Sequence, residues 1–382
     1  MNQTELLQEM LDKGGTVFVP SGEYIIEKPL IIHDNTHLKL AQDAVLRLPD
    51  GEAFSLIEND GLRGEHENHN IRIEGGVWDG ANLKRERKFL APEEGYAKGG
   101  TFHKERYFRN NYFGCPMRLV HCRNLYVGNL TVKDPLTFGM QLADTVEFTV
   151  ENIYLDYNCK KRNMDGVHIT GPARFGYIRN IHGIANDDQV ALTADATAVT
   201  EITRGPIEDI VIDGVFGENT YTGVRLLSSG NPVRNITIRN LHGSCRFNAI
   251  SFTHHDQHPG APSLIENIHI SDVYMSKPAS YNHNDGMFHF SVEEKMAVSC
   301  PLIEFFSGTV SRNVRIENVF RRETRNEVDA PLIAIQKDAK VEGLSLGMVV
   351  QHFPDGRVVP VLCDQNIPAQ EEKNAVSENE SV

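Results

Sequence analysis

The residues most capable of chemistry lie between positions 163 and 190. Asp165 is followed 22 positions later by Asp187, which is adjacent to Asp188. If one turn of a repeating structure separates them, three carboxylates share one small patch. Like charges that close repel each other, so the pKa of at least one carboxyl should be raised. A protonated acid and an ionised base working at the same pH are what general acid/base catalysis requires.

Two other uses of these aspartates stay open from the sequence. In the first, the Asp and Asn side chains have a purely structural role and hydrogen-bond the backbone at a corner of the chain. Three aspartates could also bind Ca²⁺, which takes about six to eight oxygen ligands. The catalytic alternative has its own geometric requirement: inverting cleavage of a glycosidic bond needs two carboxyls about 6.5–9.5 Å apart, with room for a water between them.

The element that must position these residues is a repeated one. An apolar residue, one further residue, a small polar residue or glycine, and another apolar residue recur along the chain. The third position of this pattern is occupied by Asn129, Asn152, Asn180, Gly214, Asn240, Asp272 and Asn318. Short alternating strands joined at a residue that tolerates the left-handed conformation predict the rungs of a parallel solenoid.

The spacing of the pattern narrows the fold class. From position 129 to 272 the intervals are 23, 28, 34, 26 and 32 residues. A β-propeller needs blades of about 40 residues, and leucine-rich or helical repeats keep a tighter period. The sequence therefore predicts an all-β, single-stranded parallel β-helix that forms one elongated domain over residues 1–364.

The two ends and one insertion depart from this rhythm. Residues 4–13 are predicted to form a short helix that covers the strand edges of the first rung. Thr4 is the predicted N-cap, and the residues expected to share the apolar face are Leu6, Leu7, Met10 and Leu11. Residues 83–112 are predicted to form a long loop beside the rod, and the acidic tail 365–382 is predicted to be disordered.

Composition limits the partners. The chain has 38 Lys and Arg against 52 Asp and Glu, a formal charge of −14. This argues against a nucleic-acid partner, which needs a basic face. No apolar run reaches about 18 residues, so no membrane partner is expected. The start of the chain lacks the pattern of a secretory signal and the six cysteines have no CxxC spacing, so a cytoplasmic protein with free thiols is expected.

At the aspartates the sequence resembles glycoside hydrolase family 28, the polygalacturonase-like enzymes of the pectate-lyase-like superfamily. Residues 163–169 are similar to the family motif Asn-Thr-Asp-Gly, often continued Ile-His-Val, with Met164 in place of Thr. Residues 186–190 are similar to the core of Gly-Asp-Asp-Cys-Ile. The resemblance extends over about residues 1–245 and implies a right-handed parallel β-helix with its site in a groove on one sheet.

The resemblance also implies roles for the motif residues. Asp187 would be the general acid on the leaving oxygen. Asp165 and Asp188 would activate a water, and Asn163 would support them.

Two departures from the family pattern bear on the substrate. The family's Gly-His-Gly histidine is replaced by Thr222, and the lysine of its Arg-Ile-Lys motif is lost, with Leu227 in its place if Arg225 is the matching arginine. A pocket without that ammonium loses a charge-assisted contact with a uronate carboxylate. We therefore expect a neutral or differently substituted sugar, with Arg225 as a sugar or carboxylate ligand.

Histidines could supply the missing imidazole. His254 and His255 follow the next rung, and His168 lies in the first aspartate motif. We expect all three to contact substrate, although each could equally be an ordinary polar residue. Their spacing meets no metal-site rule, so no metal or cofactor is expected.

The sequence thus predicts an inverting glycosidase that acts on an oligo- or polysaccharide. Two alternatives stay open. One is a lyase, epimerase or intramolecular glycosyl transferase on the same scaffold, and the other is a non-catalytic glycan-binding β-helix.

Overall fold

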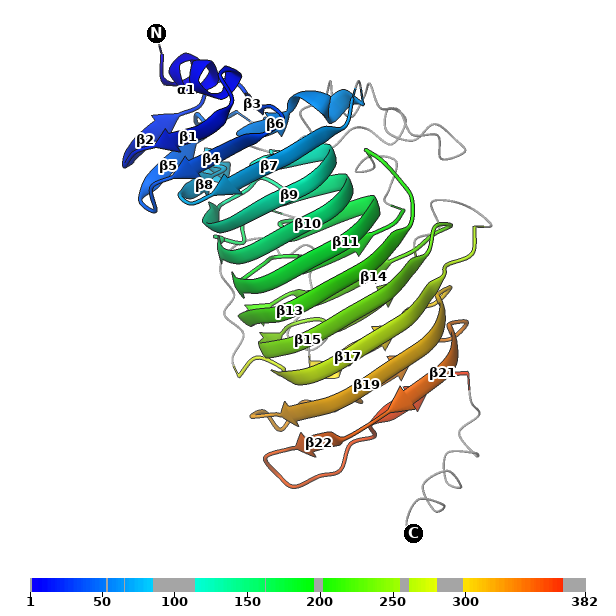
Figure 1. The fold of residues 1–382 in the computed structure, drawn as a ribbon. Coiled ribbons are helices and arrows are strands. Elements are labelled where there is room, and N and C mark those ends of the chain that lie inside the picture. The colour runs from blue at the N-terminus through cyan, green and yellow to red at the C-terminus, as the bar shows by residue number, and fades with distance from the viewer. Residues whose placement is uncertain are drawn as a thin grey trace, which may run out of the picture.

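In a computed structural model the chain forms a right-handed parallel β-helix, a rod of stacked rungs (Figure 1). The structure describes residues 2–52, 54–64, 66–84, 114–161, 163–195, 202–254, 261–279 and 298–366. Neighbouring rungs pair in parallel, as β9 (Met117–Lys133) does with β10 (Met140–Asp156), and β10 with β11 (Val167–Gly183). The predicted fold class is confirmed.

The remaining strands fall into three groups along the rod. The N-terminal rungs contain β1 (Gly15–Val19), β2 (Gly22–Ile25), β3 (Leu30–Ile32), β4 (Thr36–Leu40), β5 (Ala44–Arg47), β6 (Ile57–Asn59), β7 (Asn68–Glu74) and β8 (Val77–Asp79), with 3₁₀ helices at Asp60–Arg63 and Asn82–Lys84. The middle rungs contain β12 (Asp188–Thr193), β13 (Ile207–Thr220), β14 (Thr222–Leu227), β15 (Val233–Cys245), β16 (Ile250–Thr253), β17 (Ile265–Ser276), β18 (Ile303–Phe305) and β19 (Val310–Arg322). The last rungs contain β20 (Ile333–Ile335), β21 (Lys340–Leu346), β22 (Val349–His352) and β23 (Leu362–Asp364).

Each long strand bends at two corners and so runs over three faces of the rod. In β11 the corners are Phe175 and Asn180, both with positive φ. Residues 167–173 lie on what we call the first face, 176–179 on the second face and 181–183 on the third face. A closing turn, here residues 184–187, then leads to the first face of the next rung, which is β12. Both aspartate motifs lie where a closing turn meets the first face.

The corner residues predicted from sequence form the bend between the second and third faces. Asn129, Asn152 and Asn180 have φ of 56°, 54° and 54°, in the left-handed region that asparagine tolerates. Nδ2 of Asn152 donates to Oδ1 of Asn129 at 2.8 Å, and Nδ2 of Asn180 donates to Oδ1 of Asn152 at 2.9 Å. The side-chain amides of Asn129, Asn152 and Asn180 thus form an asparagine ladder with one amide in each of these rungs, and the predicted rung pattern is confirmed.

The bend between the first and second faces is a second corner, which the sequence pattern did not predict. It lies five residues before the first one, and its positive-φ residues are Asn124, Glu147, Phe175, Asp209, Asn235, Asn267 and Asn313. The sequence does not show this corner as a regular repeat, because Glu and Phe interrupt the run of Asn and Asp.

Phe175 is a bulky residue held at a φ of 59° with its side chain half exposed. A non-glycine residue in this region carries a strain of roughly 1–3 kcal/mol, which asparagine largely avoids. Phe175→Asn is therefore expected to stabilise the protein by about 1 kcal/mol, although it loses the stacking of Arg174, 4.3 Å from the ring centroid. The urea midpoint measures this. Phe175→Ala is the control, because it removes the ring but keeps the strain. An equal gain in both variants would contradict the strain argument.

The N-terminal helix α1 spans Gln3–Asp12 and packs over the first rungs. The predicted cap at Thr4 is wrong. The N-cap is Asn2, whose side chain accepts from the amide of Glu5 at 2.8 Å while the Glu5 carboxylate accepts from the amide of Asn2 at 3.2 Å. Thr4 is instead buried, and its hydroxyl accepts from the amide of Glu27 at 2.9 Å, which ties the helix to the rod. The predicted apolar face is also too wide, because Leu6 is exposed.

The main hydrophobic core runs along the rod, from Leu7 in α1 to Ala339 after β20. The six cysteines are free thiols as predicted, and burial raises the pKa of Cys115 to about 12. In the part of the chain that the structure describes, no helix is long and apolar enough to cross a membrane. Most of the predicted loop 83–112 and most of the predicted tail 365–382 lie outside the described residues.

Candidate active site

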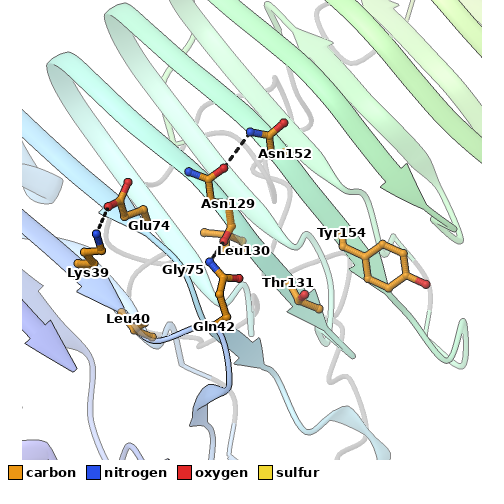
Figure 2. Close-up of a pocket in the computed structure, with 10 residues that line it drawn as sticks. All are labelled: Lys39, Leu40, Gln42, Glu74, Gly75, Asn129, Leu130, Thr131, Asn152 and Tyr154. Carbon is orange, nitrogen blue, oxygen red and sulfur yellow. Dashed lines mark hydrogen bonds and ion pairs between the residues drawn. The ribbon is translucent and has the colours of Figure 1, made fainter. Parts of the chain in front are cut away.

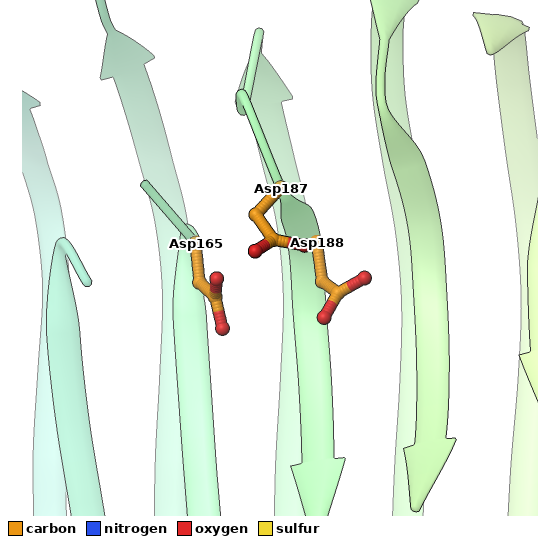
Figure 3. Close-up of side chains that lie close together, drawn as sticks. All are labelled: Asp165, Asp187 and Asp188. Carbon is orange, nitrogen blue, oxygen red and sulfur yellow. The ribbon is translucent and has the colours of Figure 1, made fainter. Parts of the chain in front are cut away.

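The three aspartates meet at the junction of two closing turns with the first face. Figure 3 shows Asp165 on one rung and Asp187 and Asp188 on the next, with the Asp187 carboxylate turned toward Asp165. All three are buried, and one carboxylate oxygen from each lies within 4.8 Å of the others. The clustering predicted from the 22-residue interval is therefore present.

The register shows which aspartates are level with each other. Val167 pairs with Val190, an offset of 23 residues, and the amide of Gly166 donates to the carbonyl of Asp188 at 2.8 Å. Asp188, not Asp187, is therefore level with Asp165. Asp187 precedes that level by one residue, so its side chain leaves the backbone at a different angle and still reaches the same place.

Asp165 is paired with His168. Nδ1 of His168 lies 2.6 Å from Oδ2 of Asp165, and both side chains are almost fully buried. Phe138 stacks on the imidazole, with ring centroids 4.0 Å apart, and the Tyr157 hydroxyl donates to the carbonyl of Asp165 at 3.1 Å. Burial, together with the nearby Arg225 charge, lowers the pKa of His168 to about 3. The ring is therefore neutral near pH 7, and its Nδ1 lies within hydrogen-bond distance of the Asp165 carboxylate.

Asp188 is paired with Arg225. Nε of Arg225 lies 2.8 Å from Oδ2 of Asp188, and Thr222 stands beside Asp188 in the next rung. This register confirms that Thr222 occupies the predicted place next to the second aspartate motif. Burial raises the pKa of Asp188, while Arg225, His168 and a hydrogen bond from Thr222 oppose that rise.

Asp187 is a carboxyl whose pKa is strongly raised. Burial, and then the charges of Asp188 and Asp165, raise the pKa of Asp187 well above its usual range. Arg225 and the amide of Asn163, which donates to Oδ2 of Asp187 at 3.2 Å, act in the opposite direction. A raised pKa favours the protonated form of Asp187, which is the form that a general acid needs.

The carboxylates lie close together, with one oxygen from each within 4.8 Å of the others. The roughly 6.5–9.5 Å of inverting glycosidases and the roughly 5–5.5 Å of retaining ones are separations between whole carboxyl groups, which are larger than the shortest distance between their oxygens. The stereochemical outcome is therefore tested by the experiment proposed below.

A divalent cation fits this cluster poorly. Three carboxylates so close could attract one, but Ca²⁺ takes about six to eight oxygens. The Arg225 guanidinium already neutralises Asp188 at 2.8 Å and would repel a second cation. The arrangement suits proton transfer better than metal binding.

The structure does not bring His254 to the aspartates. His254 follows β16, which is two rungs from Asp188. It also lies six strand positions further along the first face, so His254 and Asp188 are about 20 Å apart. Its Nδ1 lies 3.0 Å from the carbonyl of Ser228. His255 lies outside the described residues. Any contact of His254 with substrate would therefore be remote from the cleavage point.

The sequence reasoning missed a polar column that runs along the first face. His168 is in register with Gln141 and Arg118 on one side and with Ala191 and then Arg225 on the other. The column continues through Ser251 and Glu304, and at its start Arg118 pairs with Glu58. A signal was present, because each of these residues except Glu58 stands between two apolar ones, as in Met117-Arg118-Leu119 and Ile303-Glu304-Phe305.

Comparison with known proteins supports the fold and a distant relationship. No protein-family model matches the sequence. Over 114 residues the chain is 28% identical to a polygalacturonase of Persea americana, which is 29% of this chain and 24% of the relative. The matched part thus spans about a quarter of that relative's own length. The predicted resemblance to the polygalacturonases is confirmed over that part.

Two solved structures share the β-helix over nearly the whole chain. One is an iota-carrageenase in complex with iota-carrageenan fragments, with a TM-score of 0.56 and 13% identity, covering 96% of this chain and 88% of the other. The other is the A-module of a mannuronan C-5 epimerase from Azotobacter vinelandii, with a TM-score of 0.54 and 13% identity, covering 96% of each chain. At this identity the similarity concerns the fold alone.

Proposed function

We propose that this chain, a divergent polygalacturonase-like β-helix, is a glycoside hydrolase that cleaves an O-glycosidic bond of an oligo- or polysaccharide. The observation that carries the proposal is the cluster of three buried carboxylates, in which one carboxyl has its pKa raised well above its usual range. A non-catalytic glycan-binding protein has no need to bury three like charges together, since their repulsion is costly.

The proposed mechanism assigns the proton to Asp187. Asp187 donates it to the glycosidic oxygen as the bond from that oxygen to the anomeric carbon breaks. A water attacks the anomeric carbon and transfers its proton to the carboxylate pair formed by Asp165 and Asp188. His168 and Arg225, which contact these two carboxylates at 2.6 and 2.8 Å, hold them in place and favour their ionised forms.

Inversion is the proposed stereochemical outcome. Measuring it is the sharpest test of the second step, the attack of water on the anomeric carbon. The anomer released in the first minutes can be followed by proton NMR. Inversion requires a water between the sugar and the ionised aspartates. Retention would instead identify one of them as a nucleophile that forms a covalent glycosyl intermediate.

The proposed substrate is neutral or carries no free carboxylate at the cleaved sugar. Arg225 is the arginine that could bind a uronate, but in the structure its guanidinium pairs with Asp188 and lies against the cluster. A uronate placed there would add a negative charge beside three aspartates. Electrostatic repulsion in a buried site is strong, so polygalacturonate is expected to be a poor substrate.

A carbohydrate panel with reducing-end detection tests the proposal. We expect release of new reducing ends from at least one neutral plant or microbial polysaccharide, and little from polygalacturonate. Asp187→Asn, which keeps the shape of the side chain, is the control. Equal activity in that variant would refute the assignment, while a product that absorbs in the ultraviolet would indicate a lyase. Saccharide binding without any turnover would leave only a binding protein.

A further inference from the structure

A hollow of about 480 Å³ lies at the bend between the second and third faces, near the N-terminal end of the rod (Figure 2). Small-molecule sites occupy about 300–1,000 Å³, so it is large enough for one sugar ring. It lies on a different edge of the rod from the closing turns that carry the aspartates. Its chemistry is set by the side chains of Lys39, Gln42, Glu74, Asn129, Asn152 and Tyr154.

The hollow exists because the asparagine ladder ends there. Glu74 pairs with Gly128, which places Gly75 at the corner position that Asn129 occupies in the next rung. Gly75 has a φ of 85°, and a Cβ on it would lie 2.2 Å from the carbonyl oxygen of Leu40. The backbone therefore excludes any side chain at this point, and the ladder leaves an open space beyond Asn129.

A second column of side chains also stops at the hollow. The third face carries five stacked rings in successive rungs, with centroids 4.6–5.1 Å apart, formed by His182, Phe216, His242, Tyr274 and Phe320. Tyr154 is in register with His182 on one side and with Thr131 on the other. Beyond Thr131 the position is occupied by Val77. The column thus changes from rings to small side chains at the hollow, where Tyr154 is 54% exposed.

The groups around the hollow suit a neutral ligand rich in hydroxyls. Gln42 donates to the carbonyl of Asn129 at 3.4 Å, and the amides of Gln42, Asn129 and Asn152 each combine two N–H donors with an acceptor. Asn129 and Asn152 each use one N–H in a hydrogen bond within the protein, which leaves a second N–H on each amide. Glu74 pairs with Arg72 at 2.7 Å and with Lys39 at 3.5 Å, so its negative charge is neutralised for a ligand. Tyr154 adds an aromatic surface for C–H groups. A pyranose offers the complement, an apolar ring face with hydroxyls around its rim.

We propose that this hollow is a second carbohydrate-binding site, which holds one ring of a neutral glycan against Tyr154. The site binds without cleaving, because the aspartate cluster lies on another edge of the rod. The inference goes beyond the proposed hydrolysis and uses only the residues of the hollow, so it stands or falls independently of the aspartates.

Affinity electrophoresis of the full-length chain in gels that contain galactan, xylan or glucomannan tests the inference. The Asp187→Asn background keeps the polysaccharide intact during the run. In that background Tyr154→Ala is expected to weaken retardation by a neutral polysaccharide about tenfold or more. Thr131→Tyr is expected to do the same by another route, since it places a ring where the hollow now lies. Polygalacturonate should retard all variants equally little.

Tyr274→Ala is the matched control. It removes the same side chain from the same column outside the hollow, and it should leave retardation unchanged. A loss of the same size in Tyr274→Ala would assign binding to the edge of the column and overturn the inference. It is also overturned if neither hollow variant changes retardation, or if no neutral polysaccharide retards the chain. If Asp187→Asn still releases reducing ends, the proposed hydrolysis fails, while the comparison of the Tyr154 and Thr131 variants still decides this site.

Discussion

Asp187→Asn is expected to lower kcat/KM on an unactivated glycan by about 10²–10⁴-fold, the range typical of a lost general acid. The amide has nearly the same shape as the carboxyl but cannot deliver a proton to the leaving oxygen. Asp187, with its raised pKa, is the carboxyl of the cluster proposed to be neutral already, so a neutral amide should leave the fold about as stable as before. Steady-state kinetics and a thermal unfolding scan of the same preparation measure both effects.

Substrates with different leaving groups distinguish two causes of the lost activity, the missing proton donor and a damaged active site. A dinitrophenyl glycoside of the preferred sugar leaves as a stable anion and needs little protonation. We expect the Asp187→Asn deficit to shrink sharply on that substrate. A deficit of the same size on both substrates would contradict the role of acid and point to lost binding or altered geometry.

The pH profile gives a further signature of the same role. Asp187 acts when protonated, so activity should fall as pH rises through its raised pKa. The hydrogen bond from Asn163 favours the ionised form of Asp187. Asn163→Ala removes that bond and should move the alkaline limb of the profile to higher pH. A shift to lower pH would have the wrong sign for this assignment.

Arg225→Leu is expected to destabilise the protein by roughly 3–5 kcal/mol, the usual cost of removing one partner of a buried ion pair. Arg225 contacts Asp188 at 2.8 Å, and the Asp188 side chain is almost fully buried. Without the guanidinium, Asp188 must remain charged beside Asp165 and Asp187 or take up a proton, and either outcome weakens the native state. Chemical denaturation of the variant against the parent chain measures the loss.

The double variant Arg225→Leu with Asp188→Asn distinguishes the structural role of the pair from its catalytic role. Neutralising both partners should recover much of the lost stability, because no uncompensated charge is left buried. Hydrolysis should stay impaired, since one of the two carboxylates proposed to activate water is gone. If the double variant is as unstable as the single one, the ion pair is not the reason for the loss.

Much of the fold was readable from local signals. Asn129, Asn152 and Asn180 mark corners because asparagine tolerates positive φ, a property of the residue that needs no tertiary context. The other corner of each rung was not predicted, since Glu147 and Phe175 interrupt its run of Asn and Asp and nothing in those two residue types suggests a left-handed backbone. The N-cap was misplaced although a local signal selects Asn2: Glu5, three residues later, completes a capping box, whereas Thr4 is followed at that distance by Leu7.

The candidate site was predicted in part. The sequence grouped Asp165, Asp187 and Asp188, but it could not tell that Asp188 is the one level with Asp165, since one residue more in the offset between rungs changes which side chains face each other. It treated Arg225 and His168 as ligands for a substrate. In the structure each contacts an aspartate, because the register brings them onto the same face as the cluster.

The sequence by itself determined the repeating corners, the rungs they imply and the identity of the three clustered carboxylates, because these depend on residue type and approximate spacing. The tertiary structure decided which aspartates are level with each other, that His168 contacts Asp165 and Arg225 contacts Asp188, and where the side-chain columns end at Tyr154. Those features depend on which residues of successive rungs lie side by side. That register is set by turns of unequal length and by packing across the whole rod, so no local pattern encodes it.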